Sequence, residues 1–313
     1  MDKGLGRRTF LKDGLFFGVA SAVGARGLSA AGRFKQSLTT KDPSLLAVIT
    51  GPDYGKNALK AVEVLGGMKK FVAKGAKVAL LPNSQSHHPG TFTSPEILKS
   101  VIRMCREAGA SEINCLSWLN EKNWDASGLG QAIRDEGAKL ILVERKEENF
   151  RSVPIPKGIA LKEAFIMKEL SRHDVLIDMP ITKDHAGNRF TGTLKNLMGL
   201  NSPTSNNTFH KDEKDVSAIE FLDQCIADLN TVITPQLCIV DATEYIITNG
   251  PFGPGEIQKS QTVVAGTDRV AIDGYCTTLR GMKPGDIIMI RKAYEHGLGE
   301  IDLSKVKISE AKA

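Results

Sequence analysis

Short apolar runs alternate along the chain with segments whose apolar residues recur every three or four positions. The short runs predict buried strands at residues 45–50, 77–81, 112–117, 139–144, 174–179 and 236–241. The periodic segments predict amphipathic helices at residues 56–73, 94–108, 129–136, 161–172 and 216–229. This alternation predicts an α/β fold, in which a mostly parallel sheet carries helices on both faces.

Residues with special backbone preferences mark the ends of several elements. Ser94 and Pro95 predict a helix start, because a hydroxyl can cap free amides and proline fits the first helical position. Gly75 and Gly109 are placed to end the helices before them. The polar stretch 201–215 predicts a long loop. A chain of 313 residues can form one large domain or two lobes, and the sequence leaves both open.

The first 31 residues have the pattern of an export signal. Residues 6–12 read GRRTFLK and resemble the twin-arginine motif, and an apolar run at 15–25 and a small-residue stretch ending at Ala31 follow. The run is shorter than the roughly 20 residues of a membrane helix. We expect a signal peptide at 1–31, an α/β domain at 32–313, export by the twin-arginine translocase and a periplasmic location. The alternatives are an uncleaved anchor and a chance arginine pair before a buried helix.

Composition and net charge limit the kinds of molecule that this protein is expected to bind. The chain is 41% hydrophobic and 25% charged, as globular proteins are. Its formal net charge is +5, and removing the five basic and two acidic residues of the predicted signal leaves 36 basic against 34 acidic residues. This balance, without a basic stripe, argues against nucleic-acid binding. Beyond residue 32 no apolar stretch is long enough for a permanent membrane span.

The cysteines stand singly, and none forms a C-x-x-C pair. They are Cys105, Cys115, Cys225, Cys238 and Cys276. An iron–sulfur cluster or a structural zinc site normally draws on closely spaced thiolates, so the spacing supports neither. Their positions in predicted helices and strands favour buried apolar packing. A disulfide stays open, because its pairing cannot be read from the sequence.

Polar chemistry is concentrated after the predicted strand 174–179, and ligands of parallel sheets bind beyond the carboxyl ends of strands. Glycines in this segment allow close backbone approach, and an ammonium, hydroxyls and free amides can converge on a carboxylate or phosphate. The alternative is a solvated polar loop that opens a helix. The residues predicted to bind a small anion or an anionic cofactor are Arg189, Thr191, Gly192, Thr193, Lys195 and Asn196.

Two histidines flank this segment. His185 and His210, with Asp178 at the end of the preceding strand, are candidates for acid–base catalysis, since a neutral imidazole moves protons near neutral pH. Each histidine can instead be a hydrogen-bonded loop residue, which is the role we expect for His88 and His173.

A metal site is a further candidate. His87 follows one predicted strand and Asp241 ends another, and both are candidate ligands of a divalent ion. No H-x-x-x-H spacing predicts a preformed cage.

Two stretches near the C-terminus complete the candidate set. The Gly/Pro stretch 249–256 can approach a ligand or form a rigid turn, but it matches neither a dinucleotide fingerprint nor a phosphate-binding P-loop. Asp268 is expected to cap a helix that starts beside it. Asp273, five positions further, needs a partner if it faces inward.

Six ordered motifs resemble the domain of unknown function 362 family. They are LLPN at 80–83, TSPE at 93–96, ITKDHAGNRFTGTLKNLMGL at 181–200, IVDA at 239–242, NGP at 249–251 with Gly253 and Gly255, and AGTDRVAID at 265–273. The resemblance runs from about residue 45 to residue 299. It implies a link with iron–sulfur chemistry in members that carry a ferredoxin-like segment of clustered cysteines, which this chain lacks. It departs at Leu81, where the family commonly has lysine.

A shorter pattern is similar to the nickel-dependent lactate racemases. It consists of a small residue with glycine, then Lys195, Gly199 and His210. This resemblance implies a nickel pincer cofactor held by Lys195, with His210 beside it moving protons. A pyridine-type cofactor with a phosphate would suit the predicted anion site.

Two hypotheses for the function follow. The first is an exported enzyme, an oxidoreductase or isomerase, that uses a metal or organic cofactor for redox chemistry or proton transfer on a small anionic substrate. The second is a non-catalytic periplasmic protein that binds a metal or small anion. A structural partner of a redox complex is a third class.

Overall fold

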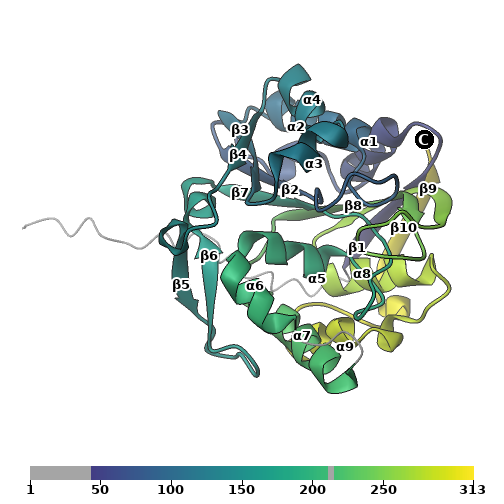
Figure 1. Ribbon diagram of the computed structural model, residues 1–313. Helices are drawn as coiled ribbons and strands as arrows, with labels where there is room; N and C mark the ends of the chain where they lie inside the picture. Colours follow the sequence, from purple (N-terminus) through teal and green to yellow (C-terminus); the bar gives the residue numbers. More distant parts are fainter. Residues whose placement is uncertain (1–43, 211–214) are drawn as a thin grey trace, which may run out of the picture.

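The structure, a computed structural model, describes residues 44–210 and 215–313, and the predicted signal peptide lies outside them. An eight-stranded sheet runs through the middle of the molecule in the order β10-β1-β9-β8-β7-β2-β3-β4 (Figure 1). Only β9 runs against its two neighbours, and the other pairings in this sheet are parallel. The strands are β1 (Leu45–Thr50), β2 (Lys77–Pro82), β3 (Glu112–Ser117), β4 (Lys139–Leu142), β7 (Val175–Met179), β8 (Leu237–Ile246), β9 (Ile257–Gly266) and β10 (Lys307–Lys312).

Helices cover both faces of the sheet, so the predicted α/β architecture is confirmed (Figure 1). Successive strand residues belong to opposite cores: Leu46 and Val48 pack on one side, and Ala47 and Ile49 on the other. One face carries α1 (Tyr54–Val64), α2 (Pro95–Glu107), α3 (Glu121–Ala126) and α4 (Leu129–Asp135). The other carries α5 (Thr193–Asn196), α6 (Pro203–Phe209), α7 (Val216–Leu229), α8 (Arg269–Thr278) and α9 (Ile288–Glu295).

The helix predicted at residues 161–172 is wrong. Strand β6 (Glu163–Met167) lies there instead, paired antiparallel with β5 (Phe150–Pro154) in a separate two-stranded sheet, and a short 3-10 helix follows at Lys168–Arg172. Burial alternates at the start of β6, because Ala164 packs inward while Glu163 and Phe165 face outward. The alternation has the period of a strand, which outweighs the helical reading.

Two other predicted boundaries move for local reasons. Helix α1 ends at Val64 rather than residue 73, because Gly66 and Gly67 have φ angles of 104° and 85°, which suit glycine and break the helix. The loop predicted at 201–215 contains α6, since the Ser202 side chain accepts from the Ser205 amide and Pro203 occupies the first turn. Helix α2 starts at Pro95 as predicted, but the Ser94 hydroxyl donates to Glu96 Oε2 and does not cap the helix amides as expected.

Strand order creates a crevice in the middle of the sheet. The chain passes outward from β2 through β3 to β4, and then returns to the opposite side of β2 as β7 and continues to β8. Such a reversal leaves space beyond the carboxyl ends of the strands, where ligands of α/β proteins bind.

The predictions about the cysteines and about membrane spans can both be checked against the residues that the structure describes. All five cysteines are buried and none forms a disulfide, which confirms the prediction that they pack in the apolar interior. No helix within residues 44–210 and 215–313 combines the length and the apolar character needed to cross a membrane.

Candidate functional site

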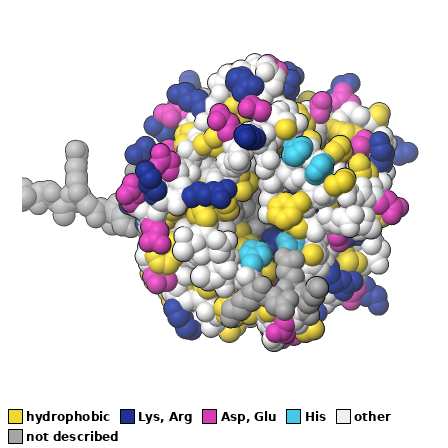
Figure 2. All heavy atoms as spheres, viewed as in Figure 1, with side chains coloured by type: hydrophobic (Ala, Val, Ile, Leu, Met, Phe, Trp, Pro, Cys, Tyr) yellow, Lys and Arg dark blue, Asp and Glu magenta, His cyan; other side chains and the backbone are white. Residues whose placement is uncertain are grey.

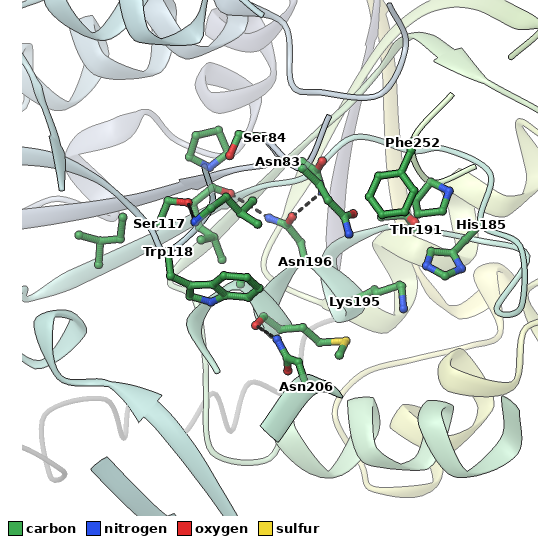
Figure 3. Close-up of a pocket in the computed structure, with 18 of the residues that line it drawn as sticks. Asn83, Ser84, Ser117, Trp118, His185, Thr191, Lys195, Asn196, Asn206 and Phe252 are labelled. Carbon is green, nitrogen blue, oxygen red and sulfur yellow. Dashed lines mark hydrogen bonds between the residues drawn. The ribbon is translucent and has the colours of Figure 1, made fainter. Parts of the chain in front are cut away.

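A cavity of about 290 Å³ lies beyond the carboxyl ends of β2 and β3 (Figure 3). Its wall comes from residues 81–85 after β2, residues 116–119 around the end of β3, the segment between β7 and α6, and the loop that contains Phe252. These segments are distant in sequence, and the reversal of strand order brings them together.

Cationic and neutral side chains line this cavity, and none of its described lining residues is acidic. Lys195 lies on the first turn of α5, and His185 lies on the loop after β7, on the same side of the cavity in Figure 3. The Lys195 Nζ donates to Asn188 Oδ1 at 2.9 Å, and Asn188 donates in turn to the Asp223 carboxylate. Asn188 therefore connects Lys195 to the Asp223 carboxylate.

His185 is a neutral imidazole at physiological pH. Its side chain is buried, and burial, with the neighbouring charge of Lys195, lowers its pKa to about 2. Its Nδ1 has no hydrogen-bond partner. His210 also lines the cavity, and its Nδ1 lies 2.9 Å from the Asn206 carbonyl oxygen. The structure thus places two imidazoles and an ammonium on one cavity.

A second lysine lies directly behind the wall. Lys183 is fully buried, and its Nζ donates to Asn83 Oδ1 at 3.1 Å and to the Thr91 carbonyl at 2.7 Å. Burial, with the charge of Lys195, lowers the pKa of Lys183 to about 7. Asn83 lines the cavity. Its side chain therefore lies between the Lys183 Nζ and a ligand bound in the cavity.

An amide pair connects this lysine to Asp178. The Asn83 Nδ2 donates to Asn196 Oδ1 at 3.0 Å, and Asn196 Nδ2 donates to Asp178 Oδ1 at 2.7 Å. Both amides line the cavity, while Asp178 is fully buried in β7 and does not. Burial raises the pKa of Asp178 well above its usual value, which favours the protonated acid. Asp178 therefore reaches the cavity only through Asn196.

The backbone amides at the start of α5 already have an anion, so the expectation that they are free to bind a ligand is wrong. The amides of Thr193 and Leu194 donate to the two Asp273 oxygens at 2.7 and 3.0 Å. A Cβ at Gly192 would collide with the same carboxylate, so this glycine permits the close approach of Asp273. Asp273 thereby has the partner that an inward position requires.

Other candidate residues lie away from the cavity. Arg189 is exposed, and its guanidinium lies 3.8 Å from the Met282 sulfur. His87 is also exposed. Asp241 accepts from the Ser94 amide and from Thr243, and it fixes the start of α2. Within the described part of the chain, no group of three or more His, Cys, Asp or Glu side chains is placed to hold a metal ion.

The remaining predictions have structural outcomes. His173 Nδ1 and Nε2 lie within hydrogen-bond distance of the Glu169 carbonyl and the Asn114 amide, which confirms its expected role. Asp268 accepts from the Ala271 amide and caps α8, as predicted. Leu81, where the family resemblance expects lysine, adds apolar surface to the cavity wall.

Sequence reasoning missed most of the other lining residues, and Ser84, Trp118 and Phe252 are examples. Ser84 lies two positions after β2 and Trp118 directly follows β3, so the rule of carboxyl ends was enough to select them, but a serine and a tryptophan alone carry no chemical motif. Phe252 stands in the Gly/Pro loop, which Ser86 holds by donating to the Phe252 carbonyl at 2.7 Å. Four polar side-chain atoms of the wall have no partner: Ser84 Oγ, Trp118 Nε1, His185 Nδ1 and Thr191 Oγ1.

A comparison with known protein families identifies the region that contains the site. A family model described as Domain of unknown function (DUF362) matches residues 78–278, a range that contains every residue lining the cavity. A thylakoid-associated protein from Synechocystis sp. is 26% identical over 234 residues, which cover 72% of this chain and 70% of the relative.

One solved structure shows a distant likeness. The lactate racemase apoprotein from Thermoanaerobacterium thermosaccharolyticum aligns with a TM-score of 0.44 and 12% identity over 76% of this chain. The chain spans 57% of the length of that protein. A likeness at this level does not extend to a binding site.

Proposed function

The chain belongs to the DUF362 family, and from the cavity within the family range we propose that it binds a small organic anion and catalyses proton transfer on it. The observation that carries this proposal is a cavity lined by Lys195, His185 and His210 and by no described carboxylate. Titratable groups with shifted pKa values that converge on one concave site are typical of catalytic centres.

Charge complementarity favours an anion. Burying a positively charged group away from water costs free energy unless an opposite charge or hydrogen bonds compensate it. Lys195 donates to the neutral Asn188 amide, and His185 and His210 line the same cavity. A bound carboxylate or phosphate would offset these costs, and it would raise the pKa values of His185 and Lys183 towards their usual range.

The same groups suit proton transfer. A carboxylate paired with Lys195 would allow neutral His185 to accept the proton from the adjacent carbon, while the electron pair of the C–H bond moves into the carboxylate. Lys195 then stabilises the increased negative charge on those oxygens. His210, the second imidazole of the wall, is the candidate to return a proton to the carbon.

The side chains described in the structure give less support to metal chemistry. The described residues contain no cluster of His, Cys, Asp and Glu that would hold an ion, and Asp241 is committed to the start of α2. We therefore derive no step through a metal. A cofactor that bears a carboxylate or phosphate is itself an organic anion and belongs to the proposed ligand class.

Isotope exchange tests the proposal. The purified protein is incubated in D₂O with short carboxylic acids that carry a hydrogen on the carbon next to the carboxylate, and NMR follows loss of that signal. We expect exchange with the native chain, loss of exchange but retained binding in His185→Gln, and loss of both in Lys195→Met. Binding without exchange would instead establish the non-catalytic anion-binding protein, and absence of binding would refute the proposed site.

We also propose export by the twin-arginine route, on the pattern of residues 6–31. Fusing residues 1–40 to a reporter that fluoresces after folding tests this. Fluorescence in the periplasm is expected, and replacing Arg7 and Arg8 by lysine should retain it in the cytoplasm. Equal export of both fusions would refute the route.

A further inference from the structure

We infer that the ligand is an amphipathic organic anion, with a planar apolar group attached to its carboxylate or phosphate. The inference rests on the proposed function, because it assigns the second half of the same cavity. It goes further in naming the chemical class that the cavity selects. The argument depends on how polar and apolar side chains are distributed along the wall.

The cavity wall has an aromatic and aliphatic part as well as a cationic and polar part. In Figure 3 Lys195, His185 and Thr191 lie together beside Phe252, whereas Trp118 lies on the other side of Asn196. Leu116, Leu119 and Met198 also line the cavity and are apolar. A small inorganic anion would contact Lys195 and His185 and leave most of the apolar side chains of the wall in contact with water, which is unfavourable.

Trp118 is held in place before any ligand binds. The Arg145 Nε donates to the Trp118 carbonyl at 3.1 Å, and the guanidinium carbon lies 5.2 Å from the centroid of the indole ring. This stacking fixes one face of the ring. Arg145 is not among the lining residues, so the cavity meets the indole and not the guanidinium. A fixed aromatic wall loses little entropy when a planar group packs against it.

The volume of the cavity supports a ring as well as an anionic group. An apolar cavity of about 150 Å³ in another protein holds benzene. The cavity here, at about 290 Å³, has room for one such ring and a carboxylate or phosphate of similar size.

Matched anions with and without a ring test the inference. Calorimetry measures binding of benzoate against acetate, and of phenyl phosphate against inorganic phosphate, which also separates the two kinds of anion. The chain contains two tryptophans, and Trp124 is fully buried in α3. Trp124→Phe leaves Trp118 as the sole indole, so quenching of its fluorescence reports a ligand beside this ring. Benzyl alcohol serves as the neutral aromatic probe.

We expect each aromatic anion to bind at least about tenfold more tightly than its small counterpart, a difference of about 1.4 kcal/mol. Trp118→Ala should reduce this ratio towards one while acetate binding stays the same, and Trp118→Phe should retain most of it. Thermal unfolding shows whether each variant is folded. Lys195→Met should weaken both anions of a pair equally.

The possible failures are distinct. Equal binding of acetate and benzoate, with both lost in Lys195→Met, would overturn the amphipathic ligand and leave the proposed anion site intact. Binding of benzyl alcohol as tight as that of benzoate, unchanged in Lys195→Met, would overturn the anion site itself. If no anion binds, both proposals are wrong.

Discussion

Burial of Lys183 should make the stability of the protein depend on pH in a defined direction. The side chain is fully buried and its two hydrogen-bond partners are neutral, and burial lowers its pKa from 10.5 to about 7. In the unfolded chain the lysine regains its ordinary pKa. Between pH 7 and 10.5 the unfolded state therefore holds one more proton than the folded state, so stability rises with pH. The cost of burial is complete below pH 7 and absent above 10.5.

The magnitude follows from the width of this window. Each pH unit within it changes the free energy of unfolding by about 1.4 kcal/mol. From pH 7.5 to 9.5 the native chain should gain about 2 to 3 kcal/mol relative to Lys183→Met, which cannot titrate. The methionine leaves Asn83 Oδ1 and the Thr91 carbonyl without their donor, at a cost of about 1–3 kcal/mol. That cost does not vary with pH. The test is therefore how the difference in unfolding free energy between the native chain and Lys183→Met changes with pH.

Urea unfolding at pH 7.5, 8.5 and 9.5 measures the difference. Lys157→Met is the matched control, because Lys157 is exposed and its replacement should give a curve parallel to that of the native chain. Parallel curves for Lys183→Met and the native chain would refute the reasoning, since the buried lysine would then keep its proton throughout the range.

Three further predictions follow from packing and hydrogen bonds. Asn196→Leu removes bonds to Asn83, the Leu81 carbonyl and Asp178 and should lower the free energy of unfolding by about 3 kcal/mol, whereas Asn207→Leu, at an exposed position, should change it little; urea unfolding compares them. Gly192→Ala places a methyl group against Asp273 and should cost about 1–3 kcal/mol, while Gly199→Ala, whose Cβ would meet Leu81 at 3.5 Å, should be tolerated; equal Tm values would contradict this. All five thiols should react with Ellman's reagent only in denaturant, and rapid labelling of the native protein would disprove their burial.

Most of the inner strands, though not β9, were predictable because their side chains are buried on both faces. Residues 45–50 and 112–117 form β1 and β3 with the predicted bounds, since a continuous apolar run between polar flanks is the pattern that a covered strand requires. Strand β10 has the sequence KISEAK and is largely exposed at the sheet edge. Its pairing with β1 depends on backbone hydrogen bonds, which leave no hydrophobic pattern.

The predicted site residues that line the cavity lie close together along the chain. Lys195, Asn196 and His185 stand within one post-strand segment, and the fold places them on one cavity. Arg189 belongs to the same segment, but its backbone has a φ of 64° and its side chain is exposed. Neighbouring positions on a loop thus face different ways, and sequence spacing does not reveal which.

Long-range pairing decides how the site holds an anion. The amides at the start of α5 are occupied by Asp273, which lies 80 residues further along the chain than Thr193. A ligand must therefore be held by side chains, and the groups that face it are titratable, unlike backbone amides. Because an anion favours the protonated forms of His185 and Lys183, binding should be coupled to proton uptake and weaken as pH rises. The chain's own carboxylate thus makes affinity at this site depend on pH.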